Sequence, residues 1–436
     1  MSRLALLAGL AALALASSVA AQEAMPTAPP PAPSPAPIPA PAAAAPPAPE
    51  AVPKEAHEPA PVEVTQLAAP DAFSTPGRDT GLPAGLWRGT PIETARTVLP
   101  LVALRPLSPA AAAMARRVLA TGARGPEGSA GDEALAGARA NALIALGDVA
   151  AAAKVLDRAP GLDRNGELAR AAAETALLAG DNARACAIAD ALTEGRGETY
   201  WLRLRAFCQA QAGQTSQAQL TLDLAQAQAK DPVFARLMAA KLGGAAPGAA
   251  SLRNGLDYAL SKALNLDLST AKAAPALAVA LSGVDPGPPA FDTAAIDGEI
   301  GGLATALRSG PPPAGALTAL IGAAAEADAK ARPRLQAAAL LIAALAPELS
   351  GADRTKLAAF PVAGGKGPAG RSLALEAAGE GKRMGEAALL ALWTCADAGA
   401  AGPAIGDRVQ IVHALARAGL MADARTFALE GLAGLK

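Results

Sequence analysis

Residues 141–152 read NALIALGDVAAA, residues 174–185 read ETALLAGDNARA, and residues 207–218 read FCQAQAGQTSQA. The glycine of each segment lies 33 residues from the next, at the end of a run rich in alanine and leucine. An alanine follows each glycine five residues later. A period in the low thirties, with two helices in each unit, is typical of a stack of helical repeats. The repeat glycines are Gly147, Gly180 and Gly213, and Gly419 near the C-terminus has the same alanine partner.

Each unit is predicted to be a pair of antiparallel helices that depends on its neighbours. A pair of Ala-rich helices buries too little apolar surface alone, so it must stack on adjacent pairs to form a core. The glycine provides the left-handed backbone that ends the first helix. Asp148 and Asp181, one residue later, are placed to cap the second helix. The alanine after each glycine lies opposite a small residue, which lets the helices approach closely; these small residues are Ala140, Ala173 and Ala206.

In this spacing of glycine, alanine and small residue, residues 141–228 resemble the tetratricopeptide repeat family, and the segment around Gly419 resembles a further unit. Most of the family's aromatic positions and its closing proline are missing here. The resemblance implies an all-α solenoid of antiparallel helix pairs, and an unrelated stack of helical hairpins is the alternative. Because β-branched and aromatic residues are scarce, we expect no sheet.

The N-terminus is predicted to be a signal peptide. A short basic end precedes an apolar run over residues 4–16, and small residues follow through Ala20 and Ala21, after either of which we expect cleavage. The apolar run is too short to span a bilayer, and a retained anchor helix is the alternative. No later stretch is apolar for long enough to cross a membrane. We therefore expect no integral membrane segment after cleavage.

Residues 26–61 contain 15 prolines among alanines. Proline fixes φ and removes a backbone donor, so this segment is expected to be a disordered, semi-rigid tether that samples polyproline II. The predicted organisation is a signal peptide (1–21), a Pro/Ala-rich tether (22–85), an N-terminal helical repeat domain (86–242) and a C-terminal helical domain that continues the solenoid (252–436).

The folded part is expected to start with the pair Leu86 and Trp87, which pack the entering chain on the first helices; partner binding is the alternative role for Trp87. Thr90-Pro91-Ile92-Glu93 has the form of a capping box with proline at the first helical position. Ser108-Pro109 repeats that start, and Gly122 is predicted to end the second helix.

Composition excludes some functions and favours one compartment. The net charge is −1, with 38 basic and 39 acidic residues, which leaves no basic excess for nucleic acid. Abundant alanine, and a preference for arginine over lysine, are typical of a GC-rich bacterial genome. With the signal peptide, they predict a periplasmic protein, with secretion as the alternative. The layout is similar to that of exported Ala-rich envelope proteins of alphaproteobacteria, a likeness that implies no activity.

Two of the three cysteines are placed to form a disulfide. Cys186 and Cys208 each lie 11 residues from Gly197, the expected turn between two helices. In an antiparallel hairpin this symmetry brings them to the same height, where an exported chain can oxidise them. A pair of buried free thiols is the alternative, because alanine-packed helices restrict the Cβ geometry. Cys395 is predicted to be a buried apolar residue.

No residue pattern specifies a reaction. The sequence has no HExxH or GxSxG motif and no phosphate-binding loop. His57 and His413 are far apart, so we expect no metal site, and nothing indicates a cofactor. Only 11 aromatic residues serve the whole chain, which weakens the case for a sugar-binding cleft. We therefore predict that the protein is not an enzyme, with a cell-wall hydrolase as the minor alternative.

One helix is predicted to carry a binding surface. Tyr200, Arg203 and Phe207 share a stripe at helical spacing, and Arg205 lies near it. Tyrosine and arginine are enriched at protein interfaces, and the tetratricopeptide resemblance implies that this helix lines a groove. Packing on the neighbouring repeat is the alternative role of these residues. The predicted function is a scaffold or adaptor for a protein or peptide partner, and the alternative is an envelope spacer or assembly element.

Overall fold

The structure is a computed structural model that describes residues 71–157, 159–282, 287, 289–292, 296, 298–311, 314–361 and 365–435. The predicted signal peptide, its cleavage site at Ala20 or Ala21, and the tether as far as residue 70 lie outside these residues. The described residues all belong to one compact unit. The predicted boundaries of the two helical domains stay a prediction.

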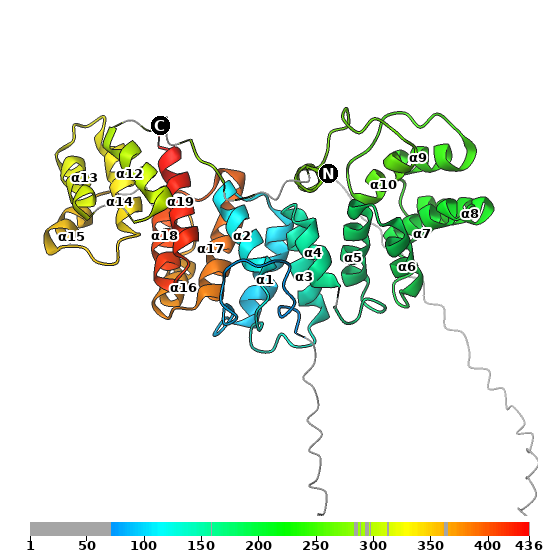
Figure 1. Ribbon diagram of the computed structural model, residues 1–436, viewed down its shortest axis with the longest axis horizontal. Helices are drawn as coiled ribbons and strands as arrows, with labels where there is room; N and C mark the ends of the chain where they lie inside the picture. The colour runs from blue at the N-terminus through cyan, green and yellow to red at the C-terminus, as the bar shows by residue number, and fades with distance from the viewer. Residues whose placement is uncertain are drawn as a thin grey trace, which may run out of the picture. The chain divides into compact units, whose positions relative to one another are not determined.

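The described part of the chain is all-α, as predicted, with nineteen α-helices, one short 3-10 helix and no strand, only two isolated β-bridges (Figure 1). The first ten helices are α1 (Ile92–Leu104), α2 (Pro109–Ala120), α3 (Glu133–Ala145), α4 (Val149–Leu156), α5 (Gly166–Ala179), α6 (Asn182–Ala191), α7 (Thr199–Gln211), α8 (Thr215–Gln228), α9 (Pro232–Gly243) and α10 (Gly255–Ala263). The later helices are α11 (Pro275–Leu281), α12 (Gly298–Ser309), α13 (Ala314–Glu326), α14 (Arg332–Ala343), α15 (Gly351–Ala358), α16 (Ala369–Glu380), α17 (Met384–Ala398), α18 (Ile405–Ala418) and α19 (Met421–Ala433).

Consecutive helices pack as pairs wherever the repeat glycines occur. α3 packs against α4, α5 against α6, α7 against α8, and α18 against α19. The glycine between the two helices of each pair has a positive φ, which is 79° at Gly147, 82° at Gly180, 75° at Gly213 and 97° at Gly419. Glycine adopts this left-handed conformation without a steric penalty, which explains why the first helix of each pair ends there.

Caps and small residues complete these pairs. The Asp148 side chain accepts a hydrogen bond from the Ala151 amide, and Asp181 accepts one from the Arg184 amide, so both cap the second helix of their pair. The alanines that follow the glycines and the small residues that precede them are fully buried, which brings the two helix backbones close together. They are Ala140, Ala152, Ala173, Ala185, Ala206, Ala218 and Ala424.

The order of helices in space departs from their order in sequence. α1 packs against α3 and also against α17, and α2 packs against α17 and α19. α10 returns to pack on α5, while α14 packs on α18 and α19. The helices near the C-terminus therefore meet the first helices of the fold, as the positions of α1, α2, α17 and α19 in Figure 1 show.

Glycine permits the close contact of α17 with the start of the fold. A Cβ on Gly385 would lie 2.6 Å from the Trp87 ring, and the Gly385 amide donates a hydrogen bond of 2.9 Å to the Leu86 carbonyl oxygen. Leu86 and Trp87 are buried, as predicted, and the Trp87 ring meets the Phe73 ring edge-on with centroids 4.9 Å apart. Trp87 is thus a core residue that links the entering chain to α17.

The predicted capping box at the start of α1 is wrong. Pro91 occupies the N-cap position, and the buried Thr90 hydroxyl has no hydrogen-bond partner among the described residues. The Thr90 amide instead closes a turn on the Trp87 carbonyl oxygen at 3.0 Å, which places Thr90 one residue too early to cap the helix. Glu93 pairs with Arg96 at 2.8 Å instead of reaching back to the cap.

The start of α2 at Ser108-Pro109 is confirmed, but its cap comes from elsewhere. The Ser108 side chain makes no capping hydrogen bond, and the Ala110 amide donates to Oε1 of Glu430 on α19 at 2.8 Å. Gly122 lies just beyond the end of α2, where a Cβ would meet Pro76 at 2.7 Å. This glycine therefore allows close packing of the entering chain.

Arg139 on α3 holds the entering chain to the helices. Its side chain is fully buried, and its guanidinium lies 5.3 Å from the centroid of the Phe73 ring. Burial lowers the pKa of Arg139 to about 9, against the attraction of Asp71, so the group stays charged at neutral pH. It donates hydrogen bonds to four backbone carbonyl oxygens at 2.7 to 3.2 Å, those of Ala72, Thr75, Leu119 and Thr121.

We expect Arg139→Met to destabilise the fold by about 3 kcal/mol or more, because two buried and two partly buried carbonyl oxygens lose their donor. Urea unfolding followed by circular dichroism measures the change. The matched control is Arg124→Met at an exposed arginine, which should stay within about 0.5 kcal/mol of the native protein. Equal midpoints for the two variants would contradict this role of Arg139.

A buried ion pair makes the contact of α2 with α19 sensitive to pH. Asp423 on α19 pairs with Arg117 on α2. Burial raises the pKa of Asp423 from 3.8 to about 6, and the opposing attraction of Arg117 only partly offsets that effect. Between these two values the folded state binds more protons than the unfolded chain, so this group's contribution to stability falls as the pH rises.

Asp423→Asn removes that titration. The free energy of unfolding of the native protein, relative to that of the variant, should therefore fall by about 2 kcal/mol between pH 4 and pH 7. Urea titrations of both proteins across this range test the expectation, with Asp223→Asn at an exposed position as control. A constant difference between the native protein and Asp423→Asn over the whole range would argue against it.

Candidate functional site

A pocket of ≈ 310 Å³ lies between α5, α7, α9 and α10. Three helices begin at or beside it, because Thr199, Asp231 and Asn254 all line it. Asp231 caps α9 by accepting hydrogen bonds from the amides of its first turn, and Asn254 caps α10 by accepting one from the Asp257 amide at 2.8 Å. The ionisable side chains that line the pocket are Arg170, Glu174, Tyr200, Arg203, Asp231 and Asp257.

Glu174 joins three of the four helices. One carboxylate oxygen accepts a hydrogen bond of 2.9 Å from the Tyr200 hydroxyl on α7, and the other accepts one of 2.7 Å from the Gly255 amide on α10. A Cβ on Gly255 would lie 2.7 Å from that second oxygen, so the contact requires glycine. The position of Glu174 on α5 is therefore fixed from two sides.

Burial shifts the pKa values of Glu174 and Tyr200. Burial raises the pKa of Glu174 above its usual value, although the hydrogen bonds from Gly255 and Tyr200 oppose the shift. Burial, and then the charge of Glu174, raise the pKa of Tyr200 well above its usual value. The Tyr200 hydroxyl therefore stays protonated at neutral pH and acts as a donor.

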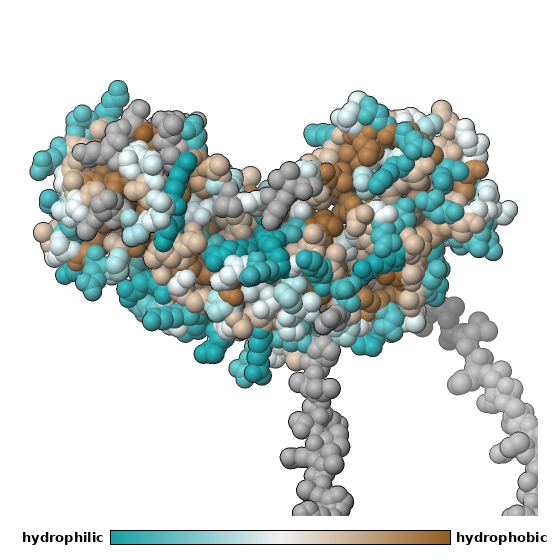
Figure 2. All heavy atoms as spheres, in the orientation of Figure 1, coloured by the Kyte–Doolittle hydropathy of each residue, from teal (hydrophilic) through white to brown (hydrophobic). Residues whose placement is uncertain are grey.

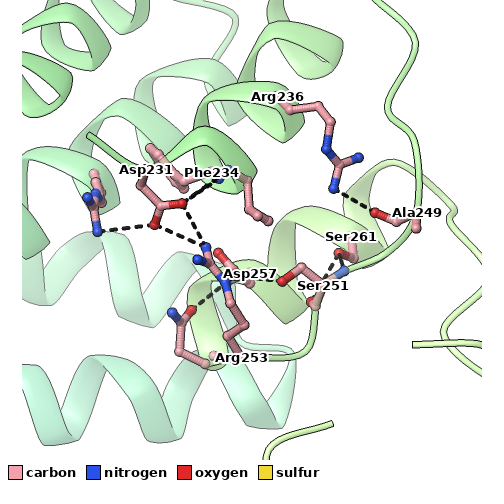
Figure 3. A network of polar contacts seen from close by, with 12 residues as sticks. Asp231, Phe234, Arg236, Ala249, Ser251, Arg253, Asp257 and Ser261 are labelled. Atoms are coloured by element: carbon pink, nitrogen blue, oxygen red, sulfur yellow. Dashed lines mark hydrogen bonds and ion pairs between the residues drawn. The ribbon is translucent and has the colours of Figure 1, made fainter. Parts of the chain in front are cut away.

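Arg253 ties the starts of α9 and α10 together (Figure 3). Its guanidinium donates to Asp257 at 2.5 Å and to Asp231 at 3.0 Å. The hydrogen bond with Asp257 is the main cause that raises the pKa of Arg253. Partial burial would raise the pKa of Asp231, but hydrogen bonds from Arg253 and the Phe234 amide outweigh it and lower the pKa. Asp231 therefore stays ionised, and both carboxylates are bound to Arg253.

The two arginines that line the pocket differ in the hydrogen bonds and ion pairs that they make. Arg203 donates to the Ala229 carbonyl oxygen at 2.9 Å, lies 3.4 Å from an Asp231 oxygen, and stacks over the Phe234 ring. Arg170 is exposed, with its guanidinium 4.8 Å from the centroid of the Tyr200 ring. Arg170 attracts Glu174 electrostatically but makes no hydrogen bond or ion pair with any residue that the structure describes. Its donors therefore remain open to a ligand.

Two of the four predicted binding residues line the pocket and two do not. Tyr200 and Arg203 line the pocket. Phe207 is fully buried and belongs to a core with Trp201 and Leu204, since the helix turns this part of the stripe inward. Arg205 donates a hydrogen bond of 2.6 Å to the Arg196 carbonyl oxygen, and burial lowers its pKa. Neither Phe207 nor Arg205 lines the pocket.

A disulfide connects the pocket helix α7 to the preceding helix pair. A disulfide joins Cys186 on α6 to Cys208 on α7, with Cα atoms 5.6 Å apart. It links two successive helix pairs, because α6 ends one pair and α7 begins the next. Cys395 on α17 is buried with a free thiol, and burial raises the pKa of that thiol to about 12.

Sequence reasoning missed most of the pocket. Arg170, Glu174 and Asp257 carry no motif, and the contact of Glu174 with Gly255 joins residues 81 positions apart. Two local signals were available at Asp231-Pro232 and Asn254-Gly255, each of which has the form of a helix start. These signals predict where helices begin, but they do not predict that the starts meet.

Metal-ligand clusters and membrane-spanning helices are absent from the part of the chain that the structure describes. There, no group of histidine, cysteine, aspartate and glutamate side chains is placed to hold a metal ion. His413 is exposed on α18, and His57 lies outside the described residues. None of the described helices has the length and apolar character needed to span a membrane. Hydrophilic and hydrophobic residues are interspersed over the face shown in Figure 2.

Comparison with known proteins gave no match, whether to a protein-family model, to a curated protein or to a solved structure. The function must therefore be argued from the pocket itself.

We expect Tyr200→Phe to lower the free energy of unfolding by about 1–3 kcal/mol, because the buried Glu174 carboxylate loses a donor. The chain's other tyrosine provides the control: the Tyr258 ring lies 5.7 Å from the Lys262 ammonium, a contact that Tyr258→Phe preserves. Urea unfolding at pH 7 compares the two variants. If they prove equally stable, the hydrogen bond between Tyr200 and Glu174 does not stabilise the fold.

Proposed function

We propose that this protein is a non-enzymatic helical-repeat scaffold or adaptor of the periplasm, which binds a segment of a protein partner in the pocket between α5, α7, α9 and α10. The observation that carries the proposal is the state of Arg170. Its guanidinium lies over the Tyr200 ring at the pocket, exposed, with its hydrogen-bond donors unused by the described residues. An arginine placed over an aromatic ring is a common anchor for a protein partner.

The rest of the pocket supports binding because its side chains hold one another in place. Both oxygens of Glu174 accept hydrogen bonds from the protein, and Asp231 and Asp257 share Arg253. Binding is stronger when the site is already ordered, since less conformational entropy is lost. A reacting acid or base needs a free atom directed at a substrate, whereas these carboxylates are engaged with the protein.

The architecture proposed for the scaffold is a solenoid similar to the tetratricopeptide repeat. The paired helices and the positive φ at Gly147, Gly180 and Gly213 support it. The periplasmic location rests on the signal peptide predicted over residues 1–21 and on the disulfide between Cys186 and Cys208, which suits an oxidising compartment.

A photoreactive benzophenone amino acid at Thr199, which lines the pocket, tests the proposal in cells that produce the protein. Ultraviolet light should yield a discrete crosslinked adduct that contains a partner protein, which mass spectrometry identifies. The same amino acid at Gln219, exposed on α8, is the control. Adducts that are identical from both positions, or absent from Thr199 at a normal protein level, would count against a partner in this pocket.

The non-enzymatic part of the proposal is tested separately. Incubation of the purified protein with peptidoglycan should release no soluble fragments. Release of fragments would favour the cell-wall hydrolase instead.

A further inference from the structure

We propose that the pocket recognises the C-terminal carboxylate of the bound peptide through the guanidinium of Arg170. This inference rests on the proposed function, because it names the chemical group that the partner presents at that site. Arg170 is exposed and has no hydrogen-bond partner among the described residues, while its guanidinium lies 4.8 Å from the centroid of the Tyr200 ring.

The contact with Tyr200 leaves the donors of the guanidinium available. The central carbon of the group lies over the Tyr200 ring, 4.8 Å from its centroid, and none of its N–H groups is bonded to a described residue. A carboxylate accepts two of these parallel donors at once, which makes the pair both stronger and more directional than a single hydrogen bond. The ring is itself fixed, because its hydroxyl donates to Glu174.

The other arginines of the site are already paired with acidic side chains. Arg253 is shared by Asp231 and Asp257, and Arg203 is held by the Ala229 carbonyl oxygen and by Asp231. Their charges are therefore largely neutralised by the protein. Glu174, on which Arg170 acts electrostatically, has two oxygens that accept hydrogen bonds from elsewhere. Arg170 is thus the pocket cation with donors to spare.

A second feature favours an anion in the same place. Thr199, the first residue of α7, lines the pocket, and no side chain caps the amides of that first turn. The amides at the start of a helix carry a partial positive charge and attract anions. The nearby carboxylates of Glu174, Asp231 and Asp257 would repel a doubly charged phosphate more than a singly charged carboxylate. The combination therefore favours a carboxylate over a phosphate.

The test uses three probes of the intact protein: N-acetyl-alanyl-alanine with a free carboxylate, the same dipeptide with a C-terminal amide, and inorganic phosphate. Each is titrated while the arginine Nε–H resonances are followed by NMR, and Arg170→Gln assigns the resonance of Arg170. The free dipeptide should shift that resonance, with a dissociation constant on the order of 1–10 mM for so small a ligand. The amide and phosphate should bind roughly 10-fold more weakly or not at all.

Variants separate a carboxylate site from a general attraction of charge. Arg170→Gln should weaken the free dipeptide by about 10- to 100-fold, and Arg170→Lys, which keeps the charge but loses the paired donors, should fall between it and the native protein. Arg184→Gln, at an exposed arginine on α6 that pairs with Asp157, is the matched control and should bind normally. Equal binding of the acid and the amide, stronger binding of phosphate, or full binding by Arg170→Gln would each overturn the inference.

The two proposals fail in different ways. A partner crosslinked from Thr199 whose capture is unaffected by Arg170→Gln would preserve the proposed function and refute the carboxylate contact. A free dipeptide that binds at Arg170 in a protein that captures no partner would preserve the contact and refute the scaffold.

Discussion

The fold depends on how closely its helices approach one another. Many of the buried residues are alanines, and glycine permits several of the closest contacts. Small side chains bury little area, so dispersion at short distance must provide much of the attraction. Gly385 against Trp87 shows the requirement most clearly, because even one added carbon would overlap the ring. Gly379 meets the backbone of Ala414 in the same way, which brings α16 onto α18. A chain built in this way tolerates few enlargements at its helix contacts.

Sequence reasoning succeeded where the determinants are local. The 33-residue spacing of Gly147, Gly180 and Gly213 predicts helix ends because a positive φ is a property of one residue, and all three glycines have it. The all-α class could be predicted from composition, because the preference of a residue for helix or strand is also a local property. Trp87 was predicted to be buried, but the sequence did not predict its contact with α17, which lies far along the chain.

The rest of the structure is set by contacts between distant residues. The amide at the start of α2 is capped by Glu430, 320 residues away, so the nearby Ser108 hydroxyl is not used. The candidate site has the same origin. Tyr200 and Arg203 could be chosen from one helical stripe, but Arg170 and Glu174 belong to the preceding pair, and only the return of α10 to α5 completes the pocket. No periodic pattern in the sequence predicts that α10 packs on α5.

The contact between the ends of the folded region has a consequence for the order in which the molecule can be assembled. Arg105 bonds to Asp397, 292 positions later. In addition to their contacts with α3, α1 packs against α17, and α2 packs against α17 and α19. During synthesis the earliest helices therefore emerge with one apolar side uncovered and must wait for nearly the whole chain before it is closed. Such late, long-range closure slows folding and exposes intermediates to aggregation. A chaperone that shields the nascent N-terminal segment would relieve this delay.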